Sequence, residues 1–400
     1  MAVRHGYGKI VGTDALVFAY DTGDTVNSFK GRPTTNYGPA DLADWTPEAG
    51  SEGDTAERIP TGNYYKGQPT YNCRTDATQL YRGVYSIITD LSTIAGAGGT
   101  VTVSCMIRNN NSSTDQYINA FIGHDFSSVR SIAANSDWQK VQWTVDVANM
   151  NNNNVEFRPV TRVTDEYLEM TMPMVEVNVG YASQFVNGTR SATEGLKDLT
   201  GNTSIDLTDV SFDSNAQIAF DGTDDMVAHD AIQFLSGSSY TLSQWQQLDA
   251  TANTAWQAFC GDDRFVVGDS VNSGGYYMWH SNGRFWWYQS FDNPTYYGVI
   301  SQTLSGGNIF DRMVGESPFS VDVTFEGSTN TMKIYINGEL EATATPTWAP
   351  GLDRITFDKI GGSSNRRFTG NIPTQKLYNR ALTADEVRNN YRHYKNRFNI

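Results

Sequence analysis

The segment Met332-Lys333-Ile334-Tyr335-Ile336-Asn337-Gly338-Glu339-Leu340-Glu341-Ala342 decides the fold class of this chain. Residues of alternating polarity stand on both sides of Asn337-Gly338, a pair that readily adopts the two positive φ angles of a type I′ turn. The segment therefore predicts two antiparallel strands joined by a two-residue loop. A second pair, Asn282-Gly283, predicts another hairpin of the same kind.

Alternation with a period of two recurs at residues 101–107, 141–147 and 319–325, which is typical of strands that bury one face and expose the other. One segment predicts a helix of useful length, from Thr383 to about Asn396. It opens with a Thr-x-x-Glu capping box at Thr383 and Glu386, and we expect this helix to lie against a sheet edge. The chain is therefore predicted to be all-β with a short C-terminal helix.

Composition agrees with this class and excludes others. The 400 residues contain 12% aromatic residues, 36 glycines and only 18% charged residues, a profile of turn-rich β structure. The formal net charge of −15 argues against nucleic acid and anionic lipid as partners. The sequence contains no run of 18 apolar residues, the length that would predict a membrane-spanning helix.

The N-terminal residues and the cysteines indicate the cellular compartment in which the chain is made. The first eight residues contain no apolar signal-peptide core, so we expect synthesis and assembly in a cytosol. Cys73, Cys105 and Cys260 are too few for a disulfide framework and fit no zinc-binding spacing. Because Cys105 alternates within an apolar strand pattern, we expect it to be a small buried side chain.

Three segments resemble the laminin-G-like, or concanavalin A-like, jelly-roll superfamily. They are the hairpin at 333–340, the stretch from Phe368-Thr369-Gly370 to Tyr378-Asn379-Arg380-Ala381-Leu382, and the turn Phe220-Asp221-Gly222. In this family the first strand usually leads soon into an Asp-Leu-Thr/Ser-Gly-Asn turn. Here Leu16–Asp21 resembles that strand, but Asp198-Leu199-Thr200-Gly201-Asn202 follows much later, so an insertion is expected.

The inserted part is similar to the jelly-roll carbohydrate-binding modules of glycanases and phage fibres. Its exit, Tyr181-Ala182-Ser183-Gln184-Phe185-Val186-Asn187-Gly188-Thr189-Arg190, is similar to segments in tailed-phage structural proteins. The resemblance implies two antiparallel β-sandwich domains, one inserted into the other. The expected divisions are 1–38 for the N-terminal segment and first strand, 39–189 for the insertion, and 190–400 for the remainder of the first domain.

No catalytic residues are predicted. Concanavalin A-like glycanases carry carboxylates in a Glu-x-Asp-x-x-Glu pattern, which is absent here, and the five histidines are scattered. No cofactor or metal site is assigned. Some relatives of the resembled family bind structural calcium through carboxylates on loops. Five aspartates here could offer such carboxylates, although none is assigned as a ligand: Asp221, Asp224, Asp225, Asp262 and Asp263.

The hairpin around Asn282-Gly283 is rich in aromatic residues. A two-residue loop places Met278, Phe285 and Trp287 on one face, which predicts a core face. The other face carries Tyr277, Trp279, Trp286 and Tyr288, the residues predicted to bind carbohydrate, because flat rings stack on pyranose sugars. Two alternatives stay open for this face: a subunit interface, or an aromatic surface covered by a loop.

The resemblance implies a non-enzymatic structural protein of a tailed-phage virion, such as a fibre, decoration or tail-associated subunit, that binds host-surface glycans. Its expected location is the virion, after assembly in the host cytoplasm. The expected partners are other virion proteins, host-surface polysaccharide and further copies of itself in a homo-oligomer. The alternatives are a phage glycan depolymerase or lyase, and a bacterial surface adhesin.

Overall fold

The computed structural model divides into two compact units. Unit 1 comprises residues 1–33, 191–213 and 217–400, and unit 2 comprises 34–190 and 214–216. The structure describes residues 15–48, 56–75, 82–111, 113–123, 125–160, 166–249, 318–345, 354–363 and 366–398; between 250 and 317 it describes only the strand residues named below. In these ranges no helix is both long and apolar enough to cross a membrane.

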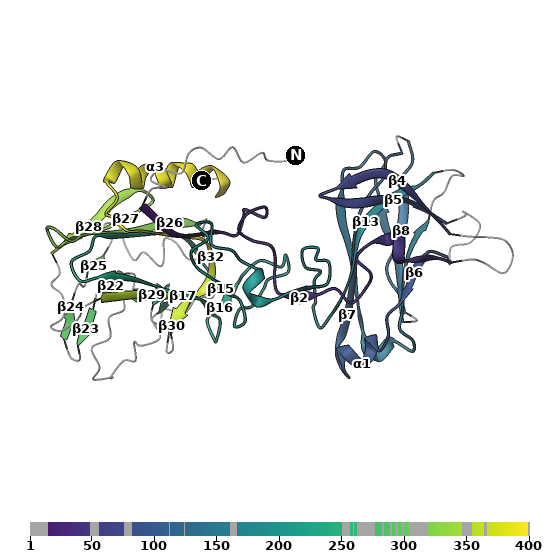
Figure 1. Cartoon of the computed structure of the whole chain (residues 1–400), viewed down its shortest axis with the longest axis horizontal. Coiled ribbons are helices and arrows are strands. Elements are labelled where there is room, and N and C mark those ends of the chain that lie inside the picture. The colour runs from purple at the N-terminus through teal and green to yellow at the C-terminus, as the bar shows by residue number, and fades with distance from the viewer. Residues whose placement is uncertain are drawn as a thin grey trace. The chain divides into compact units, whose positions relative to one another are not determined.

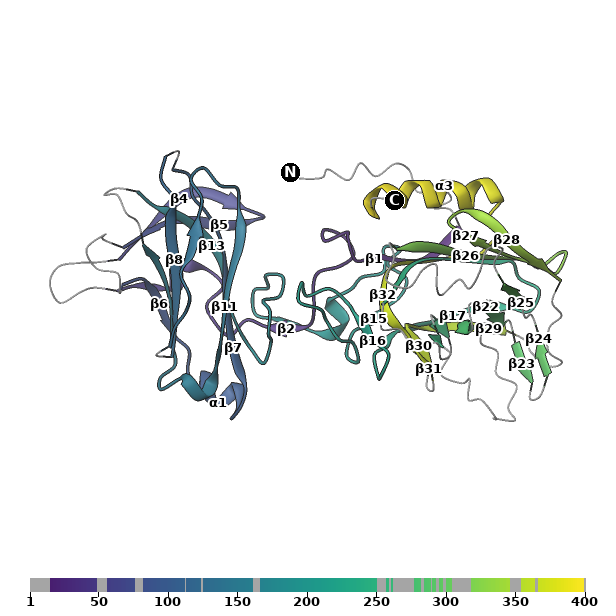
Figure 2. The ribbon, with the colours of Figure 1, turned by 180° about the vertical axis from the view of Figure 1, so that it is seen from behind.

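Unit 1 is an antiparallel sandwich in which one seven-stranded sheet forms a layer (Figures 1 and 2). Along this sheet the strands are β1 (Leu16–Asp21), β32 (Thr369–Tyr378), β18 (Tyr240–Leu248), β26 (Phe319–Glu326), β27 (Thr331–Ile336) and β28 (Glu339–Ala344), with β16 (Phe220–Asp221) also pairing with β32. The core includes Leu242, Val323 and Phe357, all nearly inaccessible to solvent.

The facing layer of unit 1 contains two smaller sheets. The first joins β15 (Ile205–Asp206), β17 (Val227–Leu235), β29 (Arg354–Ile360) and β20 (Cys260–Gly261). The second joins β19 (Gln257–Ala258), β21 (Tyr277–Ser281), β22 (Arg284–Tyr288) and β25 (Ile300–Thr303). Two short pairs complete the strands: β23 (Ser290–Asp292) with β24 (Thr295–Tyr297), and β30 (Gly362–Ser363) with β31 (Arg366–Arg367).

Helix α3 (Ala384–Lys395) is capped as its sequence predicts. The Thr383 side chain accepts a hydrogen bond from the Glu386 N–H, and the Glu386 carboxylate accepts one from the Thr383 N–H. The helix contacts the edge strand β28, where Arg388 pairs with Glu339 at 3.3 Å. It also packs on the outer face of the seven-stranded sheet, where the Tyr391 ring stacks on Trp245 of β18.

The opening hairpin is confirmed, with Asn337 at φ 51° and Gly338 at φ 78° between β27 and β28. The turn also contacts α3, since a Cβ added to Gly338 would lie 3.1 Å from the Tyr391 Cβ and 3.2 Å from the Arg388 Cα. No side chain of any size fits there without movement.

We expect Gly338→Ala to lower the free energy of unfolding of unit 1 by about 2 kcal/mol, from backbone strain plus crowding against α3. Gly237→Ala is the matched control, because Gly237 has φ 81° and nothing within 4 Å of its added Cβ. It should cost about 1 kcal/mol, from strain alone. Urea denaturation measures both, and equal losses would show that the contact with α3 is unimportant.

Unit 2 is a second antiparallel sandwich (Figure 1). One sheet joins β11 (Gln139–Asp146), β7 (Thr100–Arg108), β13 (Leu168–Val177), β5 (Gln68–Arg74) and β4 (Glu57–Tyr65). The other joins β10 (Arg130–Ile132), β8 (Gln116–Ile122), β12 (Asn154–Val160), β6 (Val84–Ile87) and β3 (Thr46–Pro47), with β9 (Asp125–Phe126) on β8. Strand β2 (Thr34–Thr35) pairs with β14 (Thr189–Arg190) in a separate two-stranded sheet. The short helix α1 (Leu91–Ala95) lies between β6 and β7 in the chain.

Both sandwiches confirm the all-β prediction and its strands at 101–107, 141–147 and 319–325. Their interiors bury the alternating apolar residues, including Val103 and Trp143 of unit 2. All three cysteines are free and buried, as expected for Cys105. The predicted insertion spans 39–189, and the compact second unit spans 34–190 with 214–216.

Asp198 links the first strand of unit 1 to the segment that follows unit 2. Its carboxylate accepts hydrogen bonds from the Ala19 N–H of β1 at 2.9 Å and from the Thr200 hydroxyl at 2.5 Å. It also accepts from three backbone N–H groups of its own turn, those of Thr200, Asn202 and Thr203. The Asp-Leu-Thr-Gly-Asn turn is therefore the junction between β1 and the later part of the chain.

Candidate functional site

The predicted aromatic hairpin is present as β21 and β22. Their register pairs Trp279 with Trp286 and Tyr277 with Tyr288, as the sequence predicts. Trp287 lies in the core, and its indole N–H donates to the Tyr240 hydroxyl at 3.3 Å. Trp287 therefore confirms the inward face. The turn Asn282-Gly283 and the side chains of the four predicted binding residues lie outside the described residues, so their role stays a prediction.

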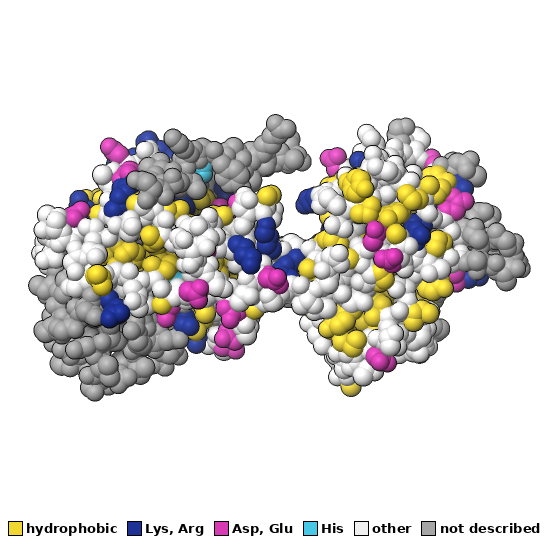
Figure 3. All heavy atoms as spheres, viewed as in Figure 1, with side chains coloured by type: hydrophobic (Ala, Val, Ile, Leu, Met, Phe, Trp, Pro, Cys, Tyr) yellow, Lys and Arg dark blue, Asp and Glu magenta, His cyan; other side chains and the backbone are white. Residues whose placement is uncertain are grey.

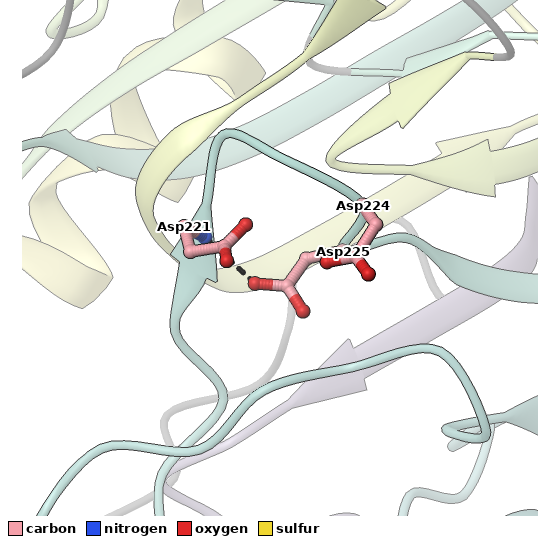
Figure 4. Close-up of side chains that lie close together, drawn as sticks. All are labelled: Asp221, Asp224 and Asp225. Atoms are coloured by element: carbon pink, nitrogen blue, oxygen red, sulfur yellow. Dashed lines mark hydrogen bonds between the residues drawn. The ribbon is translucent and has the colours of Figure 1, made fainter.

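Three carboxylates meet at the turn after β16 (Figure 4). One oxygen from each of Asp221, Asp224 and Asp225 lies within 4.8 Å of the others. Such oxygens are the donors that Ca²⁺ prefers. Asp221 and Asp224 are exposed, whereas Asp225 is buried. Asp262 and Asp263, which the sequence grouped with them, lie outside the described part of the chain.

The hydrogen bonds of Asp225 give this cluster a structural role. Its carboxylate accepts from the Ser211 N–H at 2.6 Å and from the Asp221 N–H at 2.7 Å, and the second bond is drawn in Figure 4. Burial raises the pKa of Asp225, while these backbone donors lower it. Both oxygens of Asp225 therefore serve the turn itself, which accounts for this buried carboxylate without a metal ion.

A different surface combines rings with polar groups. We call it the Glu156 face: the outer side of the β10-β8-β12-β6-β3 sheet of unit 2, opposite the core residues Val155 and Phe157. The strands place Glu156 of β12 directly between Tyr85 of β6 and Phe121 of β8. Arg158 stands opposite Asn119 in the next row. The face comprises Tyr85, Tyr117, Asn119, Phe121, Glu156 and Arg158.

Alternation along β8 produces the accessible part of this face. Ile118, Ala120 and Ile122 are buried in the core, so Tyr117, Asn119 and Phe121 point outward and are half-buried. Tyr85 is half-buried as well. Glu156 and Arg158 lie deeper, with only 4% and 6% of their surface exposed. Partly exposed rings thus surround a buried polar centre.

Four charged groups form that centre. The Arg158 guanidinium donates to Glu156 at 2.8 and 2.5 Å and lies 4.7 Å over the Phe121 ring. Arg82, which precedes β6, pairs with Glu48, which follows β3, at 2.5 Å. The Arg82 and Glu48 side chains are about one third exposed, at 30% and 29%. Solvent therefore reaches one ion pair, and the other lies beneath the surface.

The pKa of Glu156 reflects its burial and its charged neighbours. Burial raises the pKa of Glu156 to about 7; Arg158 lowers it, and hydrogen bonding with Glu48 raises it. Three side-chain oxygens here are buried and accept no hydrogen bond: Glu48 Oε2, Glu156 Oε1 and Asn119 Oδ1. Buried acceptors normally have a donor. These three oxygens are therefore unsatisfied acceptors among the described residues.

The opposite sheet of unit 2 also carries rings, but these rings already have partners. Tyr65 and Trp138 stack on each other with 4.6 Å between centroids, and the Arg108 guanidinium lies 4.9 Å from the Trp138 ring. Arg108 is in turn held by Glu169 at 2.8 Å. These rings therefore brace one another across the sheet.

Sequence reasoning missed the Glu156 face. The signal was present in Gln116–Ile122 and Asn154–Val160, where polar and aromatic residues alternate with apolar ones. Alternation of residue types does not reveal that β12 pairs with β6 and β8, because those pairings depend on the order of strands in the sheet.

Figure 3 shows acidic and basic side chains interspersed on the visible face of the described residues, without a large patch of one sign.

Comparison with known proteins places part of the chain in a fold family. Residues 221–388 match the family described as the concanavalin A-like lectin/glucanases superfamily. The sandwich over this range therefore has the concanavalin A-like jelly-roll fold, as the resemblance implied. No curated protein matches the chain.

Solved structures with a similar arrangement include receptor-binding domains of botulinum neurotoxins. The domain from serotype D is 17% identical, with a TM-score of 0.36, over 51% of each chain. The domain from type G is 17% identical, with a TM-score of 0.35, over 50% of this chain and 49% of that one. A serotype D domain in complex with N-acetylneuraminic acid is 15% identical, with a TM-score of 0.34, over 51% and 49%. The chain thus spans about half the length of these proteins.

Proposed function

We propose that this chain is a non-enzymatic glycan-binding protein of a tailed-phage virion, in which unit 2 binds host-surface polysaccharide through the Glu156 face. The observation that carries the proposal is the arrangement of three half-buried rings around buried, hydrogen-bonding side chains. Rings of Tyr and Phe pack against the C–H faces of pyranoses, and the polar groups between them bind hydroxyls. The concanavalin A-like fold of residues 221–388 is compatible with this reading.

The unpaired Asn119 Oδ1 supports a polyhydroxylated ligand in particular. This oxygen is buried and accepts no hydrogen bond from the protein. It stands opposite Arg158 and two residues from Phe121 on β8. The Asn119 side chain thus adds a polar group between the Tyr117 and Phe121 rings on the same strand face, as sugar-binding surfaces do.

The absence of catalysis is also part of the proposal. Retaining and inverting glycosidases separate their two carboxyl groups by roughly 5 to 9.5 Å, so that the reacting sugar carbon or a water fits between them. Here Glu156 is instead only 4% exposed and is paired with Arg158 at 2.5 Å, so it is not free to act on a sugar. We expect no new reducing ends when the protein is incubated with host polysaccharide. Sustained turnover would favour the depolymerase or lyase alternative.

The phage setting rests on the sequence resemblance of the inserted module and of its exit at 181–190. Many copies on a particle would convert weak single-site binding into avidity, which suits a homo-oligomer among other virion proteins. Mass spectrometry of purified particles, with immunogold labelling, tests this part. Absence of the protein from the particles would overturn the virion assignment and leave glycan binding standing.

We expect Tyr85→Ala to weaken glycan binding about tenfold, because it removes an accessible ring of the Glu156 face. Tyr85→Phe keeps the ring and should retain most of the affinity. Titration calorimetry with host polysaccharide fragments measures the dissociation constants.

The hairpin of unit 1 serves as the comparison surface. The double variant Trp279→Ala with Trp286→Ala tests the residues predicted from the sequence. If the double variant loses binding and Tyr85→Ala does not, the glycan site lies in unit 1. If neither variant weakens binding, both surfaces are excluded.

A further inference from the structure

The strand register of the Glu156 face narrows the class of glycan, on the premise that the proposed function holds. Tyr85 of β6 and Phe121 of β8 stand directly opposite Glu156 of β12, one on each side of it. Directly opposed residues of an antiparallel sheet share a face, so both rings lie on the outer side with Glu156 between them. Both rings are half-buried, whereas Glu156 is 4% exposed. A ligand that lies along this row therefore meets two rings that are separated by one strand.

The spacing of the three rings on this face follows from sheet geometry. Directly opposed residues on antiparallel strands have Cα atoms about 4.5 to 5.5 Å apart, so Tyr85 and Phe121 stand about 10 Å apart across β12. Tyr117 lies on the same strand as Phe121, about 13 to 14 Å from it at the usual rise per residue. It belongs to a different row, opposite Ser131 of β10. The rings thus offer a chain two directions: across the strands, or along β8.

An extended polysaccharide fits the direction across the strands. In a β-linked chain with a two-fold repeat each pyranose is turned over relative to the one before it, so every second sugar presents the same face. That repeat is close to the separation of Tyr85 and Phe121, whose rings can then pack on the C–H faces of alternate sugars. The longer separation of Phe121 and Tyr117 falls between whole numbers of sugars.

The row of rings is open at the end where it reaches β3. Thr46 of β3 stands opposite Tyr85 in the same row and is exposed. Because the threonine side chain is small, it forms no wall against a chain that continues past Tyr85. A site that is open in this way accepts an internal segment of a polymer as well as its end.

The two sides of the row differ in polarity. On one side the Glu48 N–H donates to the Gly83 carbonyl at 2.9 Å, which places Glu48 beside the start of β6. Its ion pair with Arg82 is about one third exposed and offers a donor and an acceptor to sugar hydroxyls. On the other side Ile87 of β6 is 65% exposed. A chain on the row therefore has a polar border and an apolar border.

We propose that the Glu156 face binds internal segments of extended β-linked polysaccharides, with the chain running across the strands so that Tyr85 and Phe121 pack on alternate sugars. The face then recognises the spacing of the sugars along the chain. A helical α-linked glycan packs on one ring only, because its sugars turn away from the flat sheet.

The test compares cello-oligosaccharides with malto-oligosaccharides, which contain the same glucose units and differ in their linkage. Titration calorimetry with the full chain measures the dissociation constants from the disaccharide to the hexasaccharide. We expect cellohexaose to bind about tenfold tighter than cellobiose, because only the longer chain packs on both rings. Maltohexaose should show no such gain over maltose.

Tyr85→Ala removes one ring of the row, so this variant should bind cellohexaose only as tightly as cellobiose. Phe121→Ala should have the same effect. Tyr85→Phe keeps the ring and should keep the tenfold gain, which separates loss of the ring from a folding defect. Tyr117→Ala is the matched control, since it removes a half-buried ring of the same face that lies outside the row, and it should keep the gain as well.

The outcomes separate this inference from the proposed function. A cellohexaose affinity no better than that of cellobiose, or an equal gain for the malto-oligosaccharides, would overturn the inference. Glycan binding stands in that case if Tyr85→Ala still weakens binding of host polysaccharide. Loss of the gain in Tyr117→Ala and not in Tyr85→Ala would place the chain along β8 and overturn the inference as well. Failure of every oligosaccharide, with host polysaccharide bound equally by Tyr85→Ala, would remove the Glu156 face as a glycan site.

Discussion

Asp198→Ala is expected to lower the free energy of unfolding of unit 1 by about 4 kcal/mol. The carboxylate accepts five hydrogen bonds, and it is only 8% exposed. Removing it leaves the Ala19 N–H of β1 and the N–H groups of its own turn without their acceptor. The loss falls on the junction between the first strand and the later turn, where the Leu199 N–H to Ala19 carbonyl bond remains.

Urea denaturation, followed separately for the two units, measures this effect. Asp206→Ala is the matched control, because the Asp206 carboxylate accepts only from the N–H and the hydroxyl of Thr208 at an exposed turn. We expect that control to cost about 1 kcal/mol. A loss in Asp198→Ala no larger than in Asp206→Ala would contradict the role of Asp198 as the junction of the two segments.

Lys376→Met is expected to lower the free energy of unfolding of unit 1 by about 3 to 5 kcal/mol at pH 8. Lys376 of β32 and Asp322 of β26 flank Ser243 of β18 in one row, on the sheet face that α3 covers. They are 3% and 1% exposed, and the Lys376 Nζ lies 4.3 Å from the centre of the Tyr394 ring. Replacing the ammonium leaves the Asp322 carboxylate buried without its counter-charge.

The pH dependence of this loss has a definite sign. Burial raises the pKa of Asp322 to about 7, although Lys376 lowers it, and burial lowers the pKa of Lys376 to about 8. A carboxyl whose pKa is raised on folding contributes stability that is present below its ordinary pKa near 4 and lost as the pH rises through about 7. At pH 5 Asp322 is protonated in both proteins, so the deficit of Lys376→Met should shrink.

The double variant Lys376→Met with Asp322→Leu removes both charges. It should recover most of the stability at pH 8, because well-packed apolar side chains can replace two buried opposite charges. Lys333→Met, at a half-buried lysine of β27 in the same sheet, should cost less than 1 kcal/mol. A deficit for Lys376→Met that is equal at pH 5 and pH 8 would show that the loss comes from packing alone.

Local patterns predicted the elements of this protein well. Asn337-Gly338 predicted a turn whose positive φ angles depend on those two residues alone. Thr383 and Glu386 predicted the start of α3, because a capping box is complete within one turn. The aromatic hairpin predicted the register of β21 and β22, since a two-residue loop leaves one pairing.

The position of α3 could not be predicted in the same way. Its aromatic stripe shows that one face is buried, but the partner, Trp245, is brought under it by the order of strands in the sheet. The Asp322–Lys376 pair has the same origin. Each residue reads as a polar position on a strand, and only the register across β32, β18 and β26 places both beneath the helix.

The sequence by itself determined the all-β class, the principal hairpins and the capped helix, because these depend on local backbone preferences and on a period of two. The late turn at Asp198 that completes an early strand was implied by the family resemblance. Only the tertiary structure decided which polar residues meet. Glu156 of β12 lies between Tyr85 of β6 and Phe121 of β8 because of strand order, which side-chain alternation does not encode.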